Sequence, residues 1–221
     1  KYGEELWQSH FGPSWYSFDV GNVHYVVTPM LGGDHAPSYR RSDIIRWLKN
    51  DLAQTDKGKR IVLFNHDLWF WGDDLLFKDK NGEQIDFADY NLDAMIYGHW
   101  HNHYYKQLKS GLHTYCSSTP DKGGIDHGAS CFRIYNADTK GKLSSATRYT
   151  YIDGILTSAY PAEGETVSVP DGKMTVRINA YRTISDAKKV TASVERNGRL
   201  VSTVTLMPET DWGWSGAVRV S

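Results

Sequence analysis

The sequence predicts an α+β protein in which a mixed N-terminal domain, residues 1–152, precedes a small all-β module, residues 153–221. The first part is indicated by an amphipathic helical stretch that leads into a short apolar strand, and by a second short apolar strand further along the chain. The second part is indicated by a change near Asp153-Gly154 to alternating apolar and polar residues separated by turn signals.

A β-hairpin is predicted over residues 14–28, because Tyr16, Phe18 and Val20 alternate with polar neighbours and Gly21-Asn22 supplies the turn. After a loop at residues 29–41, a helix is predicted to begin near Ser42, a candidate N-cap. One helical face then carries Ile44, Ile45, Leu48 and Leu52, with Trp47 beside it.

Buried strands are predicted at residues 60–64 and 93–97, where short apolar runs are bounded by charged residues or glycine. The segment between them, residues 65–92, shows no clean period, and long segments of this kind are often functional. Further strands are predicted around residues 103–108, 112–116, 130–135 and 144–152, with Asn136–Lys142 as a hairpin loop.

The C-terminal module has the pattern of an immunoglobulin-like or fibronectin-like sandwich. Its turns are predicted at Pro170-Asp171-Gly172 and Asn197-Gly198. About five strands fit before Ser221, so we expect the module to be truncated. Four of them are predicted at residues 166–169, 174–180, 190–196 and 200–206.

Bulk composition excludes several classes of protein. The net charge is −1, from 25 basic and 26 acidic side chains, so no overall field attracts nucleic acid. No apolar run is long enough to predict a transmembrane helix. The two cysteines, Cys116 and Cys131, exclude a disulfide scaffold and a cysteine-rich zinc site. They form one disulfide or stay reduced, and we favour the reduced state.

Three histidines follow the predicted buried strands. His66 comes just after residues 60–64, and His99 and His101 follow residues 93–97 in a Gly-His-Trp-His run. Side chains at the ends of neighbouring strands build sites in α/β proteins, and neutral imidazole is a common metal ligand. These residues therefore predict a metal site, although a histidine at a strand end is often only a hydrogen-bonded polar residue.

The string DAMIYGHWHNHY resembles the Gly-His-x-His signature of the calcineurin-like metallophosphoesterases, a family that includes the purple acid phosphatases. IVLFNHDLWF resembles the strand-then-His motif that precedes this signature, and FGPSWYSFDVGNVHYVVT resembles the family's preceding hairpin. WLKNDLAQTDKGKRIVLFNH reproduces the helix–strand spacing, so the similarity covers roughly residues 10–150 in the right order.

The resemblance implies a two-metal hydrolase of phosphoric mono- or diesters, built on a two-sheet αββα sandwich of which this chain supplies a part. In the family, the histidines matching His66 and His99 bind one metal and the one matching His101 binds the other. Iron, manganese and zinc all suit such a site. A metal-activated hydroxide attacks phosphorus, and the metals stabilise the charge that develops.

The family's first three motifs, an Asp-x-His, a Gly-Asp and a Gly-Asn-His, belong before residue 10, where this chain has no room for them. Two divalent ions ~3.5 Å apart repel by roughly 19 kcal/mol at an effective dielectric of about 20, and three neutral imidazoles do not offset this. We expect the N-terminal half of the domain to be missing, one weakly held metal at most, little activity in the chain alone, and self-association through the exposed sheet. No catalytic residue is assigned, because the family's general acid lies in the missing motif.

Two other strings only resemble family motifs. Gly21-Asn22-Val23-His24 has an inserted valine, and Gly33-Asp34-His35 comes in the wrong order. Both are assigned to structure.

Residues around the histidines have two interpretations each. Asp67 orients His66 as a hydrogen-bond acceptor or is a solvated loop residue. Asn102 and His103 contact substrate or lie on the surface. The aromatic cluster Trp69-Phe70-Trp71 forms a wall of the site or fills the core.

Elsewhere the structural interpretation is favoured. Tyr39, Arg40 and Arg41 suit phosphate, yet a basic loop before a helix is the default. The Gly-rich loop at residues 122–128, which contains His127, lacks the spacing of a nucleotide P-loop. Trp212 and Trp214 are expected to pack the C-terminal module rather than stack on a sugar.

Two alternatives to the dinuclear hydrolase remain. One is a non-catalytic module that binds a glycan or protein and keeps a vestigial metal site. The other is a mononuclear hydrolase in which the three histidines leave an open position on zinc. The β module and the many tyrosines and tryptophans favour a periplasmic or extracellular protein.

Overall fold

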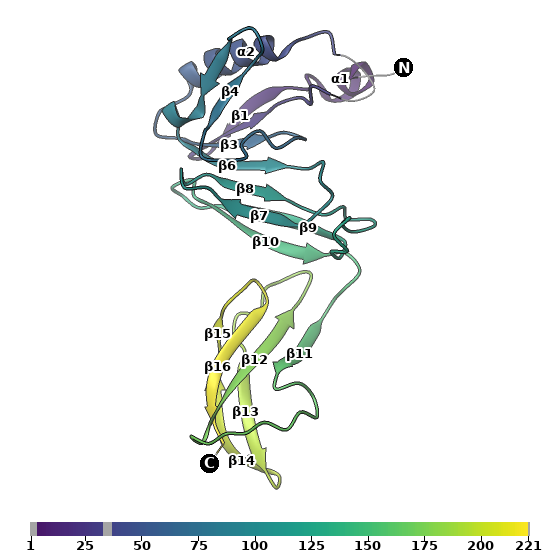
Figure 1. Cartoon of the computed structure of the whole chain (residues 1–221), viewed down its shortest axis with the longest axis vertical. Helices are drawn as coiled ribbons and strands as arrows, with labels where there is room; N and C mark the ends of the chain where they lie inside the picture. The colour runs from purple at the N-terminus through teal and green to yellow at the C-terminus, as the bar shows by residue number, and fades with distance from the viewer. Residues whose placement is uncertain (1–3, 33–36, 221) are drawn as a thin grey trace. The chain divides into compact units, whose positions relative to one another are not determined.

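The computed structural model describes residues 4–32 and 37–220. Within this part of the chain the structure is α+β, with one mixed six-stranded sheet, two α-helices and several small antiparallel sheets (Figure 1). The chain divides into two compact units, residues 1–129 with 133–145 and residues 130–132 with 146–221. The predicted domain boundary at residue 153 stays a prediction.

The mixed sheet belongs to the first unit and has the strand order β1-β2-β3-β6-β8-β7. Strands β2, β3, β6 and β8 run parallel, and β1 and β7 are added antiparallel at the two edges. The strand bounds are β1 Tyr16–Val20, β2 Val23–Val27, β3 Arg60–Phe64, β6 Leu92–Tyr97, β7 Tyr104–Gln107 and β8 His113–Cys116. The strands predicted at residues 60–64, 93–97, 103–108 and 112–116 are therefore confirmed, and so is the hairpin. Val20 pairs with Val23 across the two-residue turn.

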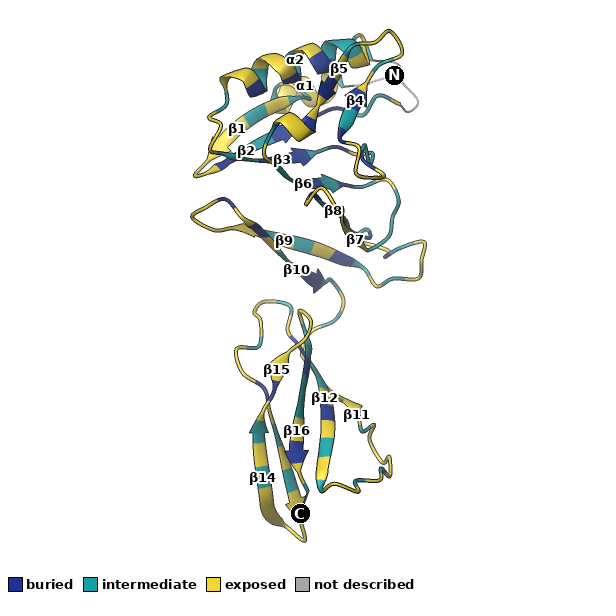
Figure 2. Cartoon of the chain, turned by 60° about the vertical axis from the view of Figure 1, so that its left-hand side comes forward, coloured by how far each residue is buried: buried dark blue, intermediate teal, exposed yellow. Residues whose placement is uncertain are grey.

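Helix α2 (Arg41–Gln54) covers one face of this sheet, and Figure 2 shows that its inner side is buried while its outer side is exposed. The predicted face is confirmed, because Ile44, Ile45, Leu48 and Leu52 are all buried. The predicted cap is wrong: Ser42 lies inside the first turn. The Asp43 carboxylate instead accepts a hydrogen bond from the backbone amide of Arg40 at 2.8 Å.

The segment that connects β3 to β6 is more regular than the sequence indicated. It forms a small hairpin of β4 (Leu76–Lys78) and β5 (Gln84–Asp86), followed by a 3₁₀ turn, η1 (Phe87–Asp89). Asp79 holds the hairpin loop, since its Oδ1 accepts from the amides of Asn81 and Glu83, each at 2.9 Å. The segment joins the core under α2 through Phe70, Leu75, Phe77, Ile85 and Phe87.

The other face of the sheet is covered in part by a second hairpin, β9 (Cys131–Ala137) and β10 (Leu143–Tyr149). Tyr135 and Leu143 pack there against a buried cluster of Val23, Val62, Ala94 and Tyr115. The predicted strands and the loop at residues 136–142 are confirmed. The division between the two units runs through both strands of this hairpin.

Tyr16, Phe18 and Val20, all on β1, remain exposed. Phe18 stacks on Tyr25 of the neighbouring strand with ring centroids 5.1 Å apart. Helix α1 (Glu5–Phe11), which the sequence did not predict, has no buried residue.

The second unit contains two antiparallel sheets within its described residues. One has the order β11-β12-β16-β15 and the other pairs β13 with β14. The bounds are β11 Ile155–Tyr160, β12 Lys173–Tyr181, β13 Thr191–Arg196, β14 Arg199–Thr205, β15 Met207–Pro208 and β16 Gly213–Arg219. Residues from both sheets share one core, which contains Val176, Val190, Leu206, Trp214 and Val218.

Three of the four strands predicted for this module are confirmed, as is the turn at Asn197-Gly198, where both residues have positive φ. The strand predicted at residues 166–169 is wrong, because that stretch pairs with no neighbour. The sheet edge is formed instead by β11, whose burial shows no alternation. Cys116 and Cys131 are both buried and neither is in a disulfide, and burial raises the pKa of Cys116.

Candidate functional site

His66 follows the C-terminal end of β3, and the residue before it fixes the loop. The Asn65 side-chain amide donates to Thr28 Oγ1 at 2.9 Å and to the Pro29 carbonyl at 3.0 Å. Its Oδ1 accepts from the Asp67 amide at 2.7 Å. Asn65 therefore joins the chain after β3 to the chain after β2, and it also holds the residue that follows His66. Residue spacing gives no sign of this role, since it depends on contacts with the chain near residue 28.

His99 follows the C-terminal end of β6, next to β3 in the sheet. The backbone amide of Gly98 donates to the His66 carbonyl at 3.1 Å, which joins the two histidine loops. A Cβ at position 98 would lie 3.3 Å from His66 Nδ1, so glycine allows the imidazole to approach the chain. His99 has φ 66° and His101 has φ 48°, both in the left-handed region that non-glycine residues rarely adopt. Such backbone conformations concentrate at functional sites.

The imidazoles of His66 and His99 meet at this edge of the sheet. Their facing nitrogens, His66 Nε2 and His99 Nδ1, are 3.3 Å apart, and the rings are nearly perpendicular with centroids separated by 5.2 Å. Both side chains are exposed to solvent. Asp67 Oδ1 lies 3.7 Å from His99 Nδ1, so the contact of this carboxylate is with His99 rather than with His66.

His101 is held through its backbone by the Gly-rich loop. The amide of Ile125 donates to the His101 carbonyl at 2.8 Å. A Cβ at position 124 would lie only 2.8 Å from the same oxygen, so Gly124 permits this close approach. In the described part of the chain, no hydrogen bond or ring contact joins the His101 imidazole to His66 or His99. The loop at residues 122–128 thus supports the backbone of His101, a role that its sequence alone does not indicate.

The donors suit a transition metal in chemistry and spacing. Two imidazole nitrogens bound tetrahedrally at about 2.0–2.1 Å from one ion lie roughly 3.3–3.4 Å apart, which matches the His66–His99 separation of 3.3 Å. No group of three or more His, Cys, Asp or Glu side chains among residues 4–32 and 37–220 is arranged to hold a metal as it stands. The structure therefore brings two of the three predicted ligands together.

Asn102 and His103 lie on the chain after His101. Asn102 Oδ1 is buried and has no hydrogen-bond partner among the described residues. Arg133 Nη2 donates to His103 Nε2 at 2.9 Å, which ties this loop to β9. The amide of Gly128, with a smaller contribution from His103, holds the pKa of the Asp126 carboxyl below its ordinary value.

The three consecutive aromatic residues after His66 have different surroundings. Phe70 is fully buried in the core, and Trp69 stacks flat on Phe77 with centroids 3.7 Å apart. The Trp71 side chain is 67% exposed and lies against Trp100 at 4.9 Å between centroids. Trp69 and Trp71 line a cavity of about 360 Å³ that also includes Asp67. Phe70 and Trp69 thus pack in or against the core, while Trp69 and Trp71 line the cavity.

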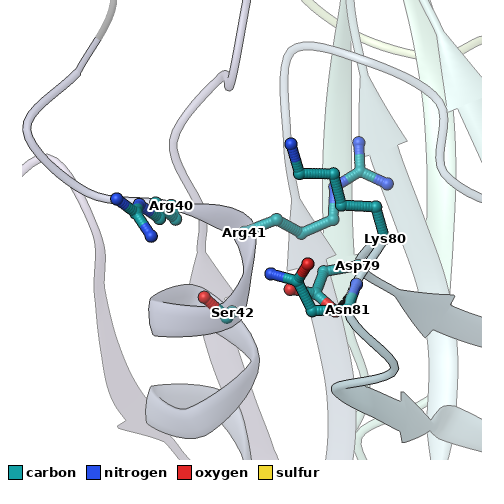
Figure 3. A pocket seen from close by; sticks show the side chains of 6 residues that line it. All are labelled: Arg40, Arg41, Ser42, Asp79, Lys80 and Asn81. Atoms are coloured by element: carbon teal, nitrogen blue, oxygen red, sulfur yellow. Dashed lines mark hydrogen bonds between the residues drawn. The ribbon is translucent and has the colours of Figure 1, made fainter.

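A second, larger cavity of about 640 Å³ lies at the start of α2 and is lined by basic residues (Figure 3). Its lining residues are Arg40, Arg41, Ser42, Asp79, Lys80 and Asn81. The Arg41 guanidinium also lies 5.1 Å above the Phe77 ring and donates to the Lys78 carbonyl at 3.3 Å. Tyr39 stacks on Trp15 and hydrogen-bonds to Glu4, so it has a structural role.

His24 is confirmed as structural. Its buried ring lies between two carboxylates, with Nδ1 2.7 Å from Asp19 Oδ1 and Nε2 2.8 Å from Asp51 Oδ2, and it links the hairpin to α2. The Gly33-Asp34-His35 string lies outside the described residues.

Trp214 is buried in the core of the second unit, and Trp212 packs edge-on against Tyr149 and Tyr181, as expected.

Comparison with known proteins assigns neither a family nor a function to this chain. No protein family matches the chain, and no curated protein sequence matches it. None of the described helices is long and apolar enough to cross a bilayer. The chemistry at the sheet edge is therefore the basis for assigning a function.

Proposed function

We propose that this protein takes part in the metal-dependent hydrolysis of phosphoric mono- or diesters, with His66, His99 and His101 as its metal ligands. The observation that carries the proposal is the 3.3 Å approach of His66 Nε2 and His99 Nδ1 at the carboxyl ends of adjacent parallel strands. Ligand sites of open α/β sheets lie at this edge.

The histidines have defined protonation requirements in this role. For both facing nitrogens to donate to a cation, His66 must carry its proton on Nδ1 and His99 on Nε2. Asp67 Oδ1 beside His99 Nδ1 adds negative charge that favours a cation at this point. A bound divalent ion would supply Lewis-acid stabilisation of charge on a phosphoryl group.

The arrangement of the helix and sheets in the first unit also supports the proposed phosphoesterase function. We propose that the first unit is part of a two-sheet αββα metallophosphoesterase sandwich. In support, α2 covers one face of the mixed sheet, while the other face carries the β9–β10 hairpin and the exposed apolar residues of β1. We propose an immunoglobulin-like sandwich for the second unit, because its two antiparallel sheets share one core.

A second candidate function is a non-catalytic module with a vestigial metal site. It is favoured by the donor count, since within the described residues only two of the three predicted histidine ligands converge. The two candidates differ in what removal of a ligand does to metal binding and to hydrolysis.

The test is a titration of the chain with Mn²⁺ and Zn²⁺, followed by calorimetry, for the unchanged chain and for the His66→Ala and His99→Ala variants. We expect at most one weak site per chain, weakened at least about tenfold in both variants. His10→Ala is the matched control, because His10 is exposed on α1 and bonds only locally. Unchanged affinity in His66→Ala and His99→Ala contradicts the assignment.

Hydrolysis decides between the two candidates. The natural protein is assayed with p-nitrophenyl phosphate and bis(p-nitrophenyl) phosphate, with and without the same substitutions. Loss of hydrolysis in His66→Ala and His99→Ala, but not in His10→Ala, supports the hydrolase. Metal binding without any hydrolysis supports the non-catalytic module.

A further inference from the structure

The cavity of about 360 Å³ next to Asp67 is of the size that small-molecule sites have in proteins. Six of the residues that line it carry the argument: Leu31, Arg41, Asp67, Trp69, Trp71 and Phe77. Aromatic and aliphatic side chains lie in its walls beside three charged residues, Arg41, Asp67 and Lys78, and the accessible lining is more polar than apolar. A cavity of this composition suits a polar ligand that also carries an organic group.

The cavity adjoins the candidate metal ligands. Asp67 lines the cavity, and its Oδ1 is also 3.7 Å from His99 Nδ1. Trp71 lines the cavity and lies against Trp100, the residue between His99 and His101. A molecule whose phosphoryl group lies at the histidines therefore has its organic group next to this cavity.

The aromatic side chains offer one ring fixed by packing and one open to solvent. Trp69 is packed flat on Phe77 at 3.7 Å and 5° between ring planes, so its position is fixed. Trp71 is 67% exposed although it is a large apolar side chain. An exposed indole at the edge of a cavity is available for stacking on a planar group.

The lining of the cavity also includes two cationic residues. Arg41 lines it and lies over Phe77, and the same side chain lines the basic cavity at the start of α2 (Figure 3). Lys78 also contributes to the lining. A ligand in the cavity would therefore lie among the carboxylate of Asp67 and the two cations Arg41 and Lys78.

We propose that this cavity selects phosphate esters whose organic group is a planar aromatic ring, which stacks on Trp71. The inference rests on the proposed function, because it takes the histidine edge as the place of the phosphoryl group. Trp71 is thereby a specificity-determining residue and not a metal ligand. Esters of small aliphatic alcohols lack the stacking surface and are expected to bind more weakly.

The test uses phosphonates, which cannot be hydrolysed at the P–C bond by this chemistry. The indole N–H signals of the ¹⁵N-labelled chain are followed by NMR during titration with phenylphosphonate, cyclohexylphosphonate and methylphosphonate, with Mn²⁺ replaced by diamagnetic Zn²⁺. We expect the Trp69 and Trp71 signals to shift saturably with phenylphosphonate, at an affinity roughly tenfold above that for the other two.

Trp71→Ala is expected to remove this preference, whereas Trp71→Phe keeps part of it. Both changes are at an exposed side chain, so the fold is retained. Trp7→Ala is the matched control, because Trp7 is 50% exposed on α1 and lines neither cavity. Equal affinity for phenylphosphonate and methylphosphonate, or a preference that survives in Trp71→Ala, overturns the inference.

The same samples separate this inference from the proposed function. If phenyl selectivity depends on Trp71 but Zn²⁺ binding does not depend on His66 and His99, the aromatic cavity stands and the hydrolase proposal fails. If Zn²⁺ binding depends on the histidines and the ligands show no phenyl preference, the hydrolase proposal stands and the aromatic selectivity is overturned.

Discussion

The backbone amide of Gly98 donates a hydrogen bond to the carbonyl oxygen of His66 at 3.1 Å, and the same glycine leaves room for the His66 ring. The two loops that carry the candidate ligands are thus fixed to one another by a main-chain contact and a side-chain contact. The position of the imidazoles depends on a residue that has no side chain of its own.

Gly98→Ala is expected to weaken metal binding by about tenfold, since the new Cβ at 3.3 Å from His66 Nδ1 displaces the ring. The measurement is the Zn²⁺ titration, with chemical unfolding to show that the fold is retained. Gly72→Ala is the control, because a Cβ there has no atom within 4 Å. Equal metal affinity in Gly98→Ala and the unchanged chain would show that the ring adjusts without loss.

Gly124→Ala is expected to destabilise the first unit by about 1–3 kcal/mol, because its Cβ would lie 2.8 Å from the His101 carbonyl, a backbone atom that has little room to move. The measurement is urea unfolding followed by circular dichroism. Gly58→Ala serves for comparison, since its contact is 3.4 Å from a flexible Asp56 side chain. The prediction fails if both variants unfold at the same urea concentration.

Asp19 makes the first unit sensitive to acid. Hydrogen bonds from Lys59 and, to a smaller extent, from His24 hold the pKa of Asp19 below its ordinary value of 3.8. A lowered folded-state pKa stabilises the fold above pH 3.8, and this contribution is lost as the pH falls through the lower folded-state value. Because the Asp19 side chain is 49% exposed, solvent screens the interaction and we expect at most about 1 kcal/mol.

The check is urea unfolding of the unchanged chain and of Asp19→Asn from neutral pH into the acid range. The stability difference between them should be largest near neutral pH and should shrink below pH 3.8. Lys59→Met is the companion variant, and NMR titration of the Asp19 carboxyl carbon should show its pKa rising. A stability difference that stays constant over the whole pH range would contradict this.

Leu206→Ala is expected to destabilise the second unit by about 2–4 kcal/mol, since Leu206 is 1% exposed in the core shared by both sheets. Tryptophan fluorescence, which includes Trp214 in that core, follows the unfolding. Leu200→Ala is the control, because Leu200 is 63% exposed on β14 and should change the stability little. Similar losses in the two variants would argue against the shared core.

The local sequence pattern was enough to predict the elements in which apolar residues alternate or recur at a clear helical period. The hairpin at residues 14–28 and the inner face of α2 follow directly from residue spacing, and the ends of β3 and β6 placed His66 next to His99. The start of α2 differs from the prediction because the Asp43 carboxylate, rather than the Ser42 hydroxyl, takes part in the cap by accepting from the Arg40 amide.

Other elements left too weak a signal. Strands β4 and β5 have three residues each, too few to show a period, and α1 has no buried face. β11 is an exposed edge strand, whereas residues 166–169 alternate without a partner. At the site, the roles of Asn65 and Gly124 depend on contacts with distant segments, so residue spacing alone cannot reveal them.

The connection from β3 to β6 contributes both to the hydrophobic core and to the lining of the cavity. Its hairpin buries Phe77 and Ile85 beneath α2, while Trp71 and Asp67 on the same segment border the cavity. A chimera that exchanges this insertion for one from another protein would have to reproduce the apolar anchors before it could reshape the binding surface. Evolutionary drift in selectivity is therefore expected to proceed by replacing single exposed positions, such as residue 71, rather than by changing the length of the segment.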